Sequence, residues 1–342
     1  MKKSLVSMAA LALIMASCSN DEENVVTGNG EVTNAVPVQI SQKVSGVETK
    51  AAVTVGSDMT AVILMADGDN PAFTPFTPRT ENVLTGEQNN TLANDAARAN
   101  VSNTQFKAST TAGEIELTPT LYYPVSSAST KAYILGVSPK GIVNGTTVTF
   151  SDVDGLQDVM YATKVNAGTS GSPESSIELN FTHETTQLTF DAKLDNADLS
   201  KTEWAGKDVS VKTITIQKAK LPESLTFSTG EINWTAEKSI SVLGCNTALT
   251  AKTCAPSVPV MVAPATNILV DLELSVGGQI KVYNNLPVKK DGGENLVTVK
   301  GKSHLVTFTI TAPTAAAGAE KVTTSAKVTD WEPGEKGSVT VK

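Results

Sequence analysis

The stretch Leu179-Asn180-Phe181-Thr182-His183-Glu184-Thr185-Thr186-Gln187-Leu188-Thr189-Phe190 indicates the fold class. Apolar side chains alternate with polar ones at Leu179 and Phe181, and again at Leu188 and Phe190, which is the period of β-strands with one buried face. Short runs of this kind recur along the chain between Gly, Pro, Asn and Ser residues, and long stretches with helical periodicity are hard to find. The sequence therefore predicts an all-β protein.

Length and turn signals indicate more than one domain. A chain of 342 residues exceeds the size at which one hydrophobic core usually stops growing. Residues 166–176 are dominated by Gly, Ser and Pro, so we expect a linker there, between domains at 35–165 and 177–342. Short predicted strands with turn signals between them are typical of β-sandwiches. We expect two β-sandwich domains in tandem.

Three local patterns predict individual elements. The apolar run at 60–65 predicts a buried strand, and Gly277-Gly278 between two alternating runs predicts a hairpin. Residues 66–114 carry several prolines and few apolar runs, so we expect long loops there, with one short helix around 92–99. The other expected strands lie at 115–123, 132–137, 146–150, 159–163, 177–182, 187–192, 209–217, 258–262, 268–276, 279–283, 304–311, 321–330 and 338–341.

The N-terminus has the pattern of a bacterial lipoprotein signal. Lys2 and Lys3 precede an apolar run of twelve residues, which is shorter than the roughly 20 residues of a membrane-spanning helix. Small residues then lead to Cys18, whose thiol can carry a diacylglycerol. We expect residues 1–17 to be a signal peptide and Cys18 to be lipidated. The alternative is an ordinary secretory signal in which the cysteine is incidental.

A tether and one isolated strand follow the signal. Residues 18–34 are polar and acidic, with too few apolar side chains to fold alone. Residues 36–44 alternate apolar and polar side chains, which predicts a strand, and Pro37 favours a position at a sheet edge. A second polar break at 45–50 separates this strand from the next one. The first strand is therefore expected to hang between two flexible pieces.

Charge argues against nucleic acid as a partner. Residues 1–17 contain two lysines and no acid, so their removal takes the formal charge from −8 to about −10. A surface that binds phosphate backbones needs clustered Lys or Arg side chains, whereas this chain contains only Arg79 and Arg98 as arginines. We expect no nucleic-acid binding.

Three stretches in the second half resemble the fimbrillin-like proteins of Bacteroidota, the subunits of type V pili. The phenylalanine-x-histidine pattern at Phe181 and His183 is similar to the motif that opens the second domain of that family. Residues 297–308 resemble the family's Gly-Lys turn leading into an alternating strand, and residues 328–341 resemble its ending with Trp and Gly, which includes Trp331. The acidic residues directly after Cys18 resemble the tag that sends lipoproteins of that phylum to the cell surface. The first domain matches only loosely.

The resemblance implies a structure, a location and a mechanism. Relatives have two transthyretin-like β-sandwich domains and reach the cell surface as outer-membrane lipoproteins. They lose their first strand to a trypsin-like protease, and then polymerise when another pilin subunit donates a replacement strand. Lys50, before Ala51, is the matching cleavage position here, although a solvated loop lysine is the other interpretation of this residue. The resemblance also implies a role in adhesion or biofilm formation as a stalk, tip, accessory or anchor subunit.

Residues that could carry other chemistry are few. Cys245 and Cys254 form an even pair in an exported chain, so a disulfide is one interpretation and two thiols are the other. With only His183 and His304 as histidines and no nucleophile motif beside them, we expect no enzyme. We also expect no cofactor and no metal, and we interpret the pair Asp67 and Asp69 as loop acids rather than as cation ligands. Trp331 is interpreted as a core residue and His183 as a half-buried residue that makes one hydrogen bond.

A different class of function stays open beside the pilin. A monomeric surface lipoprotein could use the loops at 66–114 to contact a glycan or a host protein, because exposed loops on a rigid sandwich suit binding. A hydrolase would require a fixed carboxyl separation in pairs such as Asp152 with Asp154 or Asp191 with Asp195. Solvated loop acids are the simpler interpretation of those pairs.

Overall fold

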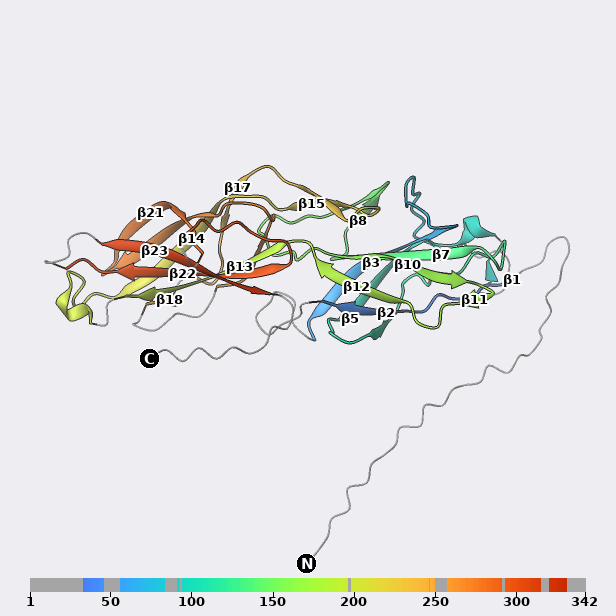
Figure 1. Ribbon diagram of the computed structural model, residues 1–342, viewed down its shortest axis with the longest axis horizontal. Helices are drawn as coiled ribbons and strands as arrows, with labels where there is room; N and C mark the ends of the chain where they lie inside the picture. The colour runs from blue at the N-terminus through green and yellow to red at the C-terminus, as the bar shows by residue number, and fades with distance from the viewer. Residues whose placement is uncertain are drawn as a thin grey trace, which may run out of the picture.

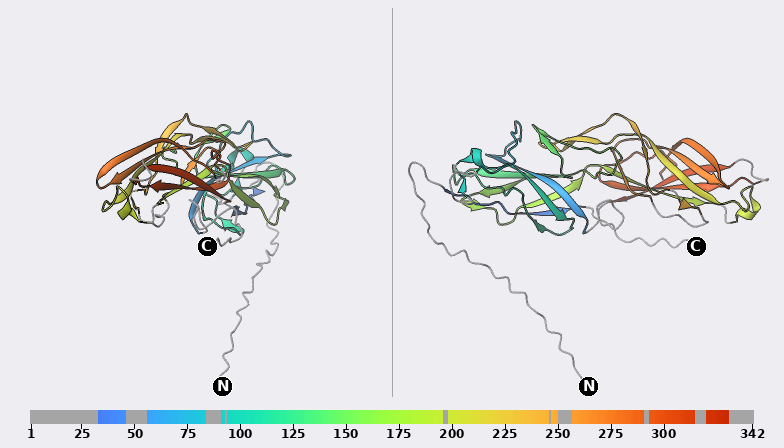
Figure 2. Two further views of the ribbon diagram at one scale, coloured as in Figure 1. Left: turned by 60° about the vertical axis from the view of Figure 1, so that its left-hand side comes forward. Right: turned by 180° about the vertical axis from the view of Figure 1, so that it is seen from behind.

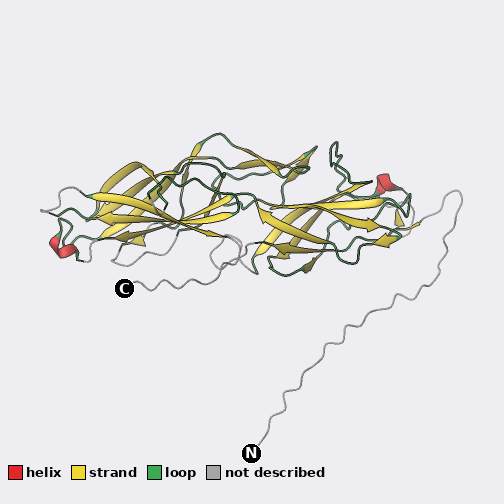
Figure 3. Ribbon diagram, in the orientation of Figure 1, coloured by secondary structure: helices red, strands yellow, loops and turns green. Residues whose placement is uncertain are grey.

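The computed structural model describes residues 33–45, 56–83, 91–92, 94–195, 198–245, 247–249, 257–290, 293–314 and 320–330. These residues form strands and loops with two short 3₁₀ helices, η1 (Asp95–Ala97) and η2 (Leu199–Lys201), so the all-β prediction is confirmed (Figure 3). Two groups of strands follow one another along the long axis of the molecule (Figure 1), and the rear view in Figure 2 shows the same order.

The N-terminal group is built on one sheet with the strand order β5-β3-β7-β10-β12-β2-β6 and with β11 paired to β10. The two ends of this sheet approach each other, because Asn103 and Thr118 exchange backbone hydrogen bonds of 2.8 and 2.9 Å. The bounds are β2 (Ile40–Val44), β3 (Asp58–Asp67), β5 (Val101–Lys107), β6 (Gly113–Ile115), β7 (Lys131–Ser138), β10 (Met160–Thr169), β11 (Ser172–Pro173) and β12 (Glu178–His183), with a separate pair β1 (Thr33–Asn34) and β4 (Thr91–Leu92).

The middle strands of the N-terminal sheet are buried on both faces. In β3, Ala61 and Ile63 face one hydrophobic cluster, whereas Val62 and Leu64 face another. This explains why the run at 60–65 is apolar without alternation. The first cluster, which we call the slot-side core, lies inside the curved sheet. The second, which we call the clasp-side core, lies on the opposite face.

The C-terminal group is a sandwich of two sheets. One sheet has the order β19-β13-β22-β23, and the other has the order β17-β14-β20-β21 with β18 paired to β14. Side chains from both sheets and Trp204 share one hydrophobic core. The bounds are β13 (Thr186–Leu194), β14 (Val209–Ala219), β17 (Lys238–Ser241), β18 (Thr247–Ala248), β19 (Val260–Val262), β20 (Leu269–Val276), β21 (Gln279–Pro287), β22 (Lys302–Thr311) and β23 (Lys321–Asp330). The hairpin predicted at Gly277-Gly278 is confirmed as the turn between β20 and β21.

A fourth sheet joins the two groups of strands. Its order is β16-β15-β9-β8, with β8 (Ile142–Asn144) and β9 (Thr147–Thr149) from the N-terminal half and β15 (Pro222–Thr226) and β16 (Glu231–Trp234) from the C-terminal half. Leu225 lies opposite Val148 across the boundary between the halves. Figure 1 shows β15 reaching toward β8 above the N-terminal strands. No local sequence pattern predicted this shared sheet.

The linker predicted at 166–176 is wrong. Residues up to Thr169 complete β10, and β11 folds back on it with Gly168 opposite Pro173. The glycines, serines and proline of this segment therefore form a hairpin turn. The strand that follows, β12, still belongs to the N-terminal sheet. The chain crosses to the C-terminal sandwich at Glu184 and Thr185, between β12 and β13.

Candidate functional site: the slot around the first long strand

Strand β2 lies inside the N-terminal sheet and not at its edge. It runs parallel to β12, with Ser41 opposite Glu178, and antiparallel to β6, with Ile40 opposite Ile115. The edge position favoured by Pro37 is therefore wrong, because this proline precedes β2 and lies opposite Tyr122 in an isolated bridge. Residues 36–45 occupy a channel between β12 on one side and β6 with residues 121–123 on the other, which we call the strand slot.

Backbone hydrogen bonds hold the slot strand at both of its ends. At its start, the Val38 amide donates to the carbonyl of Leu121 at 2.8 Å, and the Tyr123 amide donates to the carbonyl of Val36 at 3.0 Å. At its end, the Val44 amide donates to the Ser109 carbonyl, and the Ser45 amide donates to the carbonyl of Phe181, both at 2.9 Å. Both edges of the first long strand are thus satisfied by chain that lies 65 to 140 residues away in the sequence.

Three apolar side chains of the slot strand complete the slot-side core. Val38 and Ile40 are 4% exposed, and Val44 is fully buried. Burying an aliphatic side chain is worth about 1.5 to 3 kcal/mol, so the three together contribute roughly 5 to 9 kcal/mol as an upper estimate. Gln42 also points inward, and its Nε2 donates to the Lys107 carbonyl at 3.0 Å. Removing this strand would open a channel lined with apolar side chains and unpaired amides.

Phe181 belongs to the wall of the slot. It lies opposite Val44 in the parallel register and is fully buried. Its ring lies 5.7 Å from that of Phe106, and a Cβ added at Gly136 would lie only 2.6 Å from its Cζ. Phe181 therefore packs where the sheet leaves no spare volume.

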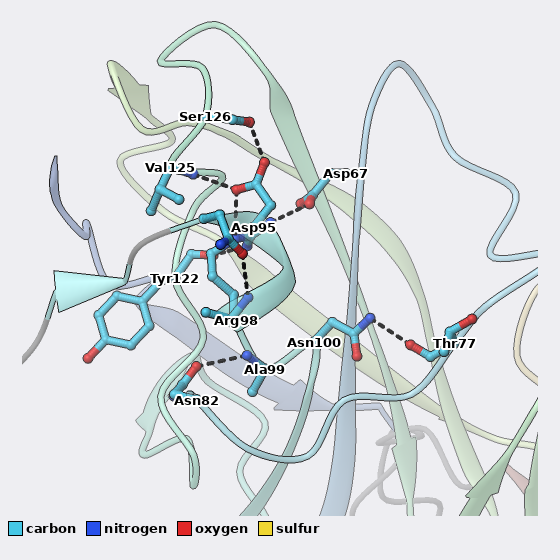
Figure 4. Close-up of polar contacts among 12 residues, drawn as sticks. Asp67, Thr77, Asn82, Asp95, Arg98, Ala99, Asn100, Tyr122, Val125 and Ser126 are labelled. Carbon is cyan, nitrogen blue, oxygen red and sulfur yellow. Dashed lines mark hydrogen bonds and ion pairs between the residues drawn. The ribbon is translucent and has the colours of Figure 1, made fainter. Parts of the chain in front are cut away.

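A buried arginine fixes the opposite wall of the slot (Figure 4). Arg98 is 1% exposed, its Nη1 donates to the carbonyl of Tyr122, and its Nη2 pairs with Asp67. Its Nε donates to Asp95 Oδ1 at 3.1 Å, and the same oxygen accepts a 2.7 Å hydrogen bond from the Val125 amide. The guanidinium thus ties η1 and β3 to the segment that binds the start of the slot strand.

The pKa values of the two carboxyl groups beside this arginine are shifted in opposite directions from their ordinary value. Burial raises the pKa of Asp67, because the loss of solvent outweighs the attraction of Arg98. Burial acts in the same direction on Asp95, but hydrogen bonds from Ser126 and Val125 together with Arg98 hold the pKa of that group below its ordinary value. Asp95 is therefore the firmly ionised partner of the guanidinium. Asp67 pairs with Arg98, and Asp69 pairs with Lys131. Both aspartates that were considered as cation ligands in the sequence therefore form ion pairs within the chain.

The chain that follows β6 moves away from the slot strand for a few residues. Residues 116–120 turn toward β5, where Ser102 Oγ donates to the Pro119 carbonyl at 2.7 Å. A cavity of about 510 Å³ opens between the diverging chains, lined among others by Val38, Ile40, Glu114 and Leu117. The slot strand is thus less enclosed beside Gln39 than at either of its ends.

Part of the region predicted as exposed loops is pinned to the sheet. Phe73 and Phe76 are 3% and 7% exposed and lie in the clasp-side core. The amide side chain of Asn100 bridges the same segment, donating to the Thr77 carbonyl at 3.0 Å and accepting from the Arg79 amide at 2.7 Å. Residues 101–107, also expected to be loop, form β5. The described part of this region therefore braces the sheet.

His183 lies where the chain passes from one group of strands to the other. It is 5% exposed, so the half-buried expectation is wrong, and its Nδ1 lies 2.7 Å from Asp158 Oδ2. Thr185 Oγ1 donates to the other oxygen of Asp158 at 3.0 Å rather than to the imidazole, so this hydroxyl is not placed as a nucleophile activated by histidine. His304 is fully buried in β22. Both histidines therefore lie in the interior of the fold.

Several predicted site residues lie outside the described residues. These are Cys18, Lys50, Ala51, Cys254 and Trp331. Cys245 is 8% exposed and its Sγ lies 3.7 Å from the Leu243 carbonyl oxygen, and its pairing with Cys254 stays a prediction. Within the described ranges there is no group of three His, Cys, Asp or Glu side chains able to hold a metal ion. The same part of the chain contains no helix long and apolar enough to cross a membrane.

Comparison with known proteins places the chain in a family. The fimbrillin-like family model matches residues 77–331, and no curated protein sequence matches. A solved structure from Bacteroides uniformis ATCC 8492, provisionally assigned to cell adhesion, is similar with a TM-score of 0.50 at 19% identity, covering 86% of this chain and 99% of its own. Another from Bacteroides ovatus ATCC 8483, with the same provisional assignment, has a TM-score of 0.46 at 15% identity, covering 89% and 100%. The fimbrial anchor protein Mfa2 from Porphyromonas gingivalis has a TM-score of 0.38 at 9% identity, covering 86% and 98%.

The family model covers about three quarters of the sequence and spans both groups of strands. It includes β12 with Phe181 and His183, the motif at 297–308, and the first residues of the motif at 328–341. The structure with a TM-score of 0.50 has the same fold over nearly its whole length. The resemblance drawn from those motifs is confirmed, and this chain belongs to the fimbrillin-like family.

Proposed function

We propose that this protein is a structural subunit of a cell-surface pilus that assembles by exchange of its first long strand. The observation that carries the proposal is the position of β2. This strand is hydrogen-bonded on both sides and covers the slot-side core, yet among the described residues only the two-residue strand β1 precedes it. Only residues 46–55 join it to the rest of the protein, so one cut there would detach it.

The proposed cut follows Lys50, before Ala51. Proteolysis there leaves the segment before the cut held by non-covalent contacts alone, in the slot and in the pairing of β1 with β4. The strand of another subunit can replace residues 36–45 by β-augmentation, in which backbone hydrogen bonds supply affinity and alternating apolar side chains supply fit. The incoming strand has to bury three apolar side chains at the positions of Val38, Ile40 and Val44. Its gain is reduced by the cost of association.

The lipid on Cys18 delivers the precursor in this proposal. Two or three acyl chains hold a protein durably on a bilayer, whereas one chain binds only marginally. The anchored precursor keeps its slot filled at the outer membrane until cleavage after Lys50. The lipid then stays with the strand that is discarded. Cys18 is a permanent anchor only in subunits that keep their first strand.

The experiment that tests this proposal uses unlipidated protein that starts at residue 19. Treatment with trypsin, N-terminal sequencing and electron microscopy report the cleavage site and the assembly state of the same sample. We expect a new N-terminus at Ala51 and filaments or ladders of high molecular weight, and neither in the matched variant Lys50→Gln. Cleavage at Ala51 that leaves only monomers would contradict strand exchange, and a different N-terminus would remove Lys50 from the mechanism.

A further inference from the structure

We propose that the hairpin of β15 and β16 is an intramolecular clasp, by which the C-terminal half keeps the N-terminal sheet folded while the strand slot opens. The hairpin lies more than 30 residues beyond the point where the chain enters the C-terminal sandwich. It nevertheless returns to the N-terminal half and pairs with β9. The proposal that the clasp stabilises the sheet after the slot strand has left rests on the proposed function. The coupling of the two halves by the clasp does not depend on that function.

The N-terminal sheet has two cores that depend on different segments. The slot-side core takes Val38, Ile40 and Val44 from the slot strand. The clasp-side core takes no side chain from the slot strand, and instead takes Leu225 and Phe227 from the hairpin. Because the two cores lie on opposite faces of β3, β7 and β10, loss of the slot strand removes packing from one face of these strands and leaves the other face unchanged.

Phe227 contacts several elements of the N-terminal half. It is fully buried, and its ring centroid lies 5.2 Å from Phe76 and 6.5 Å from Phe73 in edge-on arrangements. Its amide donates to the Thr146 carbonyl at 3.1 Å, and its carbonyl accepts a 2.8 Å hydrogen bond from the hydroxyl of Tyr161. The residue therefore binds a β-strand, a loop and a hairpin of the N-terminal half at once.

The turn of the hairpin packs closely against Tyr161 of β10. Gly230 has φ of +75°, and a Cβ added there would lie 2.7 Å from the ring of Tyr161. At the base of the hairpin, the Phe150 amide donates to the Glu223 carbonyl at 2.9 Å. The hairpin is thus fixed at its tip and at its base. Outside the hairpin, the Met261 amide donates to the Gly155 carbonyl at 2.6 Å, which is a further contact between the halves.

The geometry predicts a specific order of opening. When the slot strand leaves, β2 loses all its contacts, whereas β3 and β7 keep the hydrogen bonds to each other and the clasp-side core. When the clasp is lost, the clasp-side core loses Leu225 and Phe227 but keeps Phe73 and Phe76. With both lost, both faces of β3 are less tightly packed. Weakening the slot strand and weakening the clasp together should therefore speed hydrogen exchange in β3 and β7 by more than the two separate effects combined.

Native-state hydrogen exchange on the full chain, read by mass spectrometry, tests this order. In the variant Ile40→Ala we expect faster exchange in β2 and β6, with β3 and β7 still protected. In Phe227→Ala we expect β3 and β7 to exchange roughly 150- to 5,000-fold faster, which is the size of effect that truncating a buried Phe produces. The control Thr226→Ala, whose side chain is on the other face of β15, should leave both regions unchanged.

The double variant Ile40→Ala with Phe227→Ala decides the question. We expect exchange in β3 and β7 to be at least tenfold faster than the product of the two single effects predicts. The clasp would be contradicted if Ile40→Ala alone exposed β3 and β7 as fast as β2, or if Phe227→Ala accelerated β14 and β20 but not β3 and β7. These measurements are made on the uncleaved monomer, so failure of filament assembly would contradict the proposed function and not the clasp.

Discussion

Val44 and Phe181 lie opposite each other in neighbouring parallel strands, and both are fully buried. They stand 137 positions apart in the sequence, one in the first long strand and the other in the family motif. The contact places a family signature on the wall of the strand slot. It also means that the packing of the motif depends on a strand that we propose to be replaceable.

Replacing a buried side chain of the slot strand by alanine should weaken its binding in the slot without unfolding the protein. Val44→Ala removes a fully buried side chain, and we expect the free energy of unfolding to fall by about 2 kcal/mol. Release of the strand after cleavage should be faster for the same reason. Lys43→Ala, whose side chain lies on the other face of β2, is the matched control. Chemical denaturation and the rate of peptide release measure the two effects, and equal values for both variants would contradict the packing described.

A methyl group at Gly136 should not be tolerated. Its Cβ would lie 2.6 Å from Phe181 Cζ, so we expect Gly136→Ala to destabilise the protein by about 1 to 3 kcal/mol. Gly113→Ala is the control, because its Cβ would meet only Gln42 Nε2 at 3.7 Å. Adding Phe181→Leu to Gly136→Ala should recover part of the loss. Thermal unfolding of the three variants checks this, and an unaffected Gly136→Ala protein would show that Phe181 is not packed against β7.

Removal of the arginine that fixes the slot wall should be costly. Arg98→Ala leaves Asp67, Asp95 and the Tyr122 carbonyl without their shared donor, and breaking such a buried pair typically costs about 3 to 5 kcal/mol. We expect Arg98→Lys to recover little stability, because a single ammonium group cannot replace the planar guanidinium, whose three nitrogens each contact a different partner. Equilibrium unfolding measures both variants. Full recovery by lysine would mean that only the charge matters.

The buried histidine His304 should make the protein less stable in mild acid. Burial lowers its pKa from 6.5 to about 4, so between these values the unfolded chain binds a proton that the folded chain excludes. Its contribution to stability is complete above pH 6.5 and falls as the pH drops toward 4, by up to about 1.4 kcal/mol per pH unit. Asp67, Asp152, Glu184 and Asp191 have raised pKa values and act in the opposite direction, because the folded chain then binds more protons.

The contribution of His304 is isolated by comparison with His304→Leu. The difference in unfolding free energy between the natural protein and this variant should change between pH 7 and pH 4.5, because the four carboxyl groups are common to both. Denaturation at a series of pH values measures it. A difference that stays constant over this range would contradict the buried neutral imidazole.

Local patterns predicted the strands but not their neighbours. Alternation identified 36–44 and 177–182 as strands with a buried face, because the period reports burial directly. That these two strands pair in parallel depends on contacts across more than 130 residues, which no local pattern encodes. Strand β5 was missed because its buried positions include the polar side chains Ser102 and Thr104. A hydrogen bond from Ser102 to Pro119 makes that burial tolerable, and sequence does not reveal such a partner.

The domain boundary was misplaced for a related reason. Gly, Ser and Pro residues mark turns as well as linkers, and at 166–173 they form a turn inside the sheet. The clasp was not predicted because β15 and β16 are short, and the apolar side chains Leu225, Ile232 and Trp234 within them make no long alternating run. Arg98 could have been singled out, as one of two arginines in the chain, but its partners come from three separate segments.

The most direct test of strand exchange is to lock the first strand in its slot. Ser41 and Glu178 lie opposite each other in β2 and β12 with outward side chains, so the double variant Ser41→Cys with Glu178→Cys can join the two strands by a disulfide. We measure filament formation after trypsin treatment by electron microscopy, with and without a reducing agent. The account predicts cleavage at Ala51 in both conditions and filaments only after reduction. Filaments that form equally well from the oxidised, locked protein would contradict it.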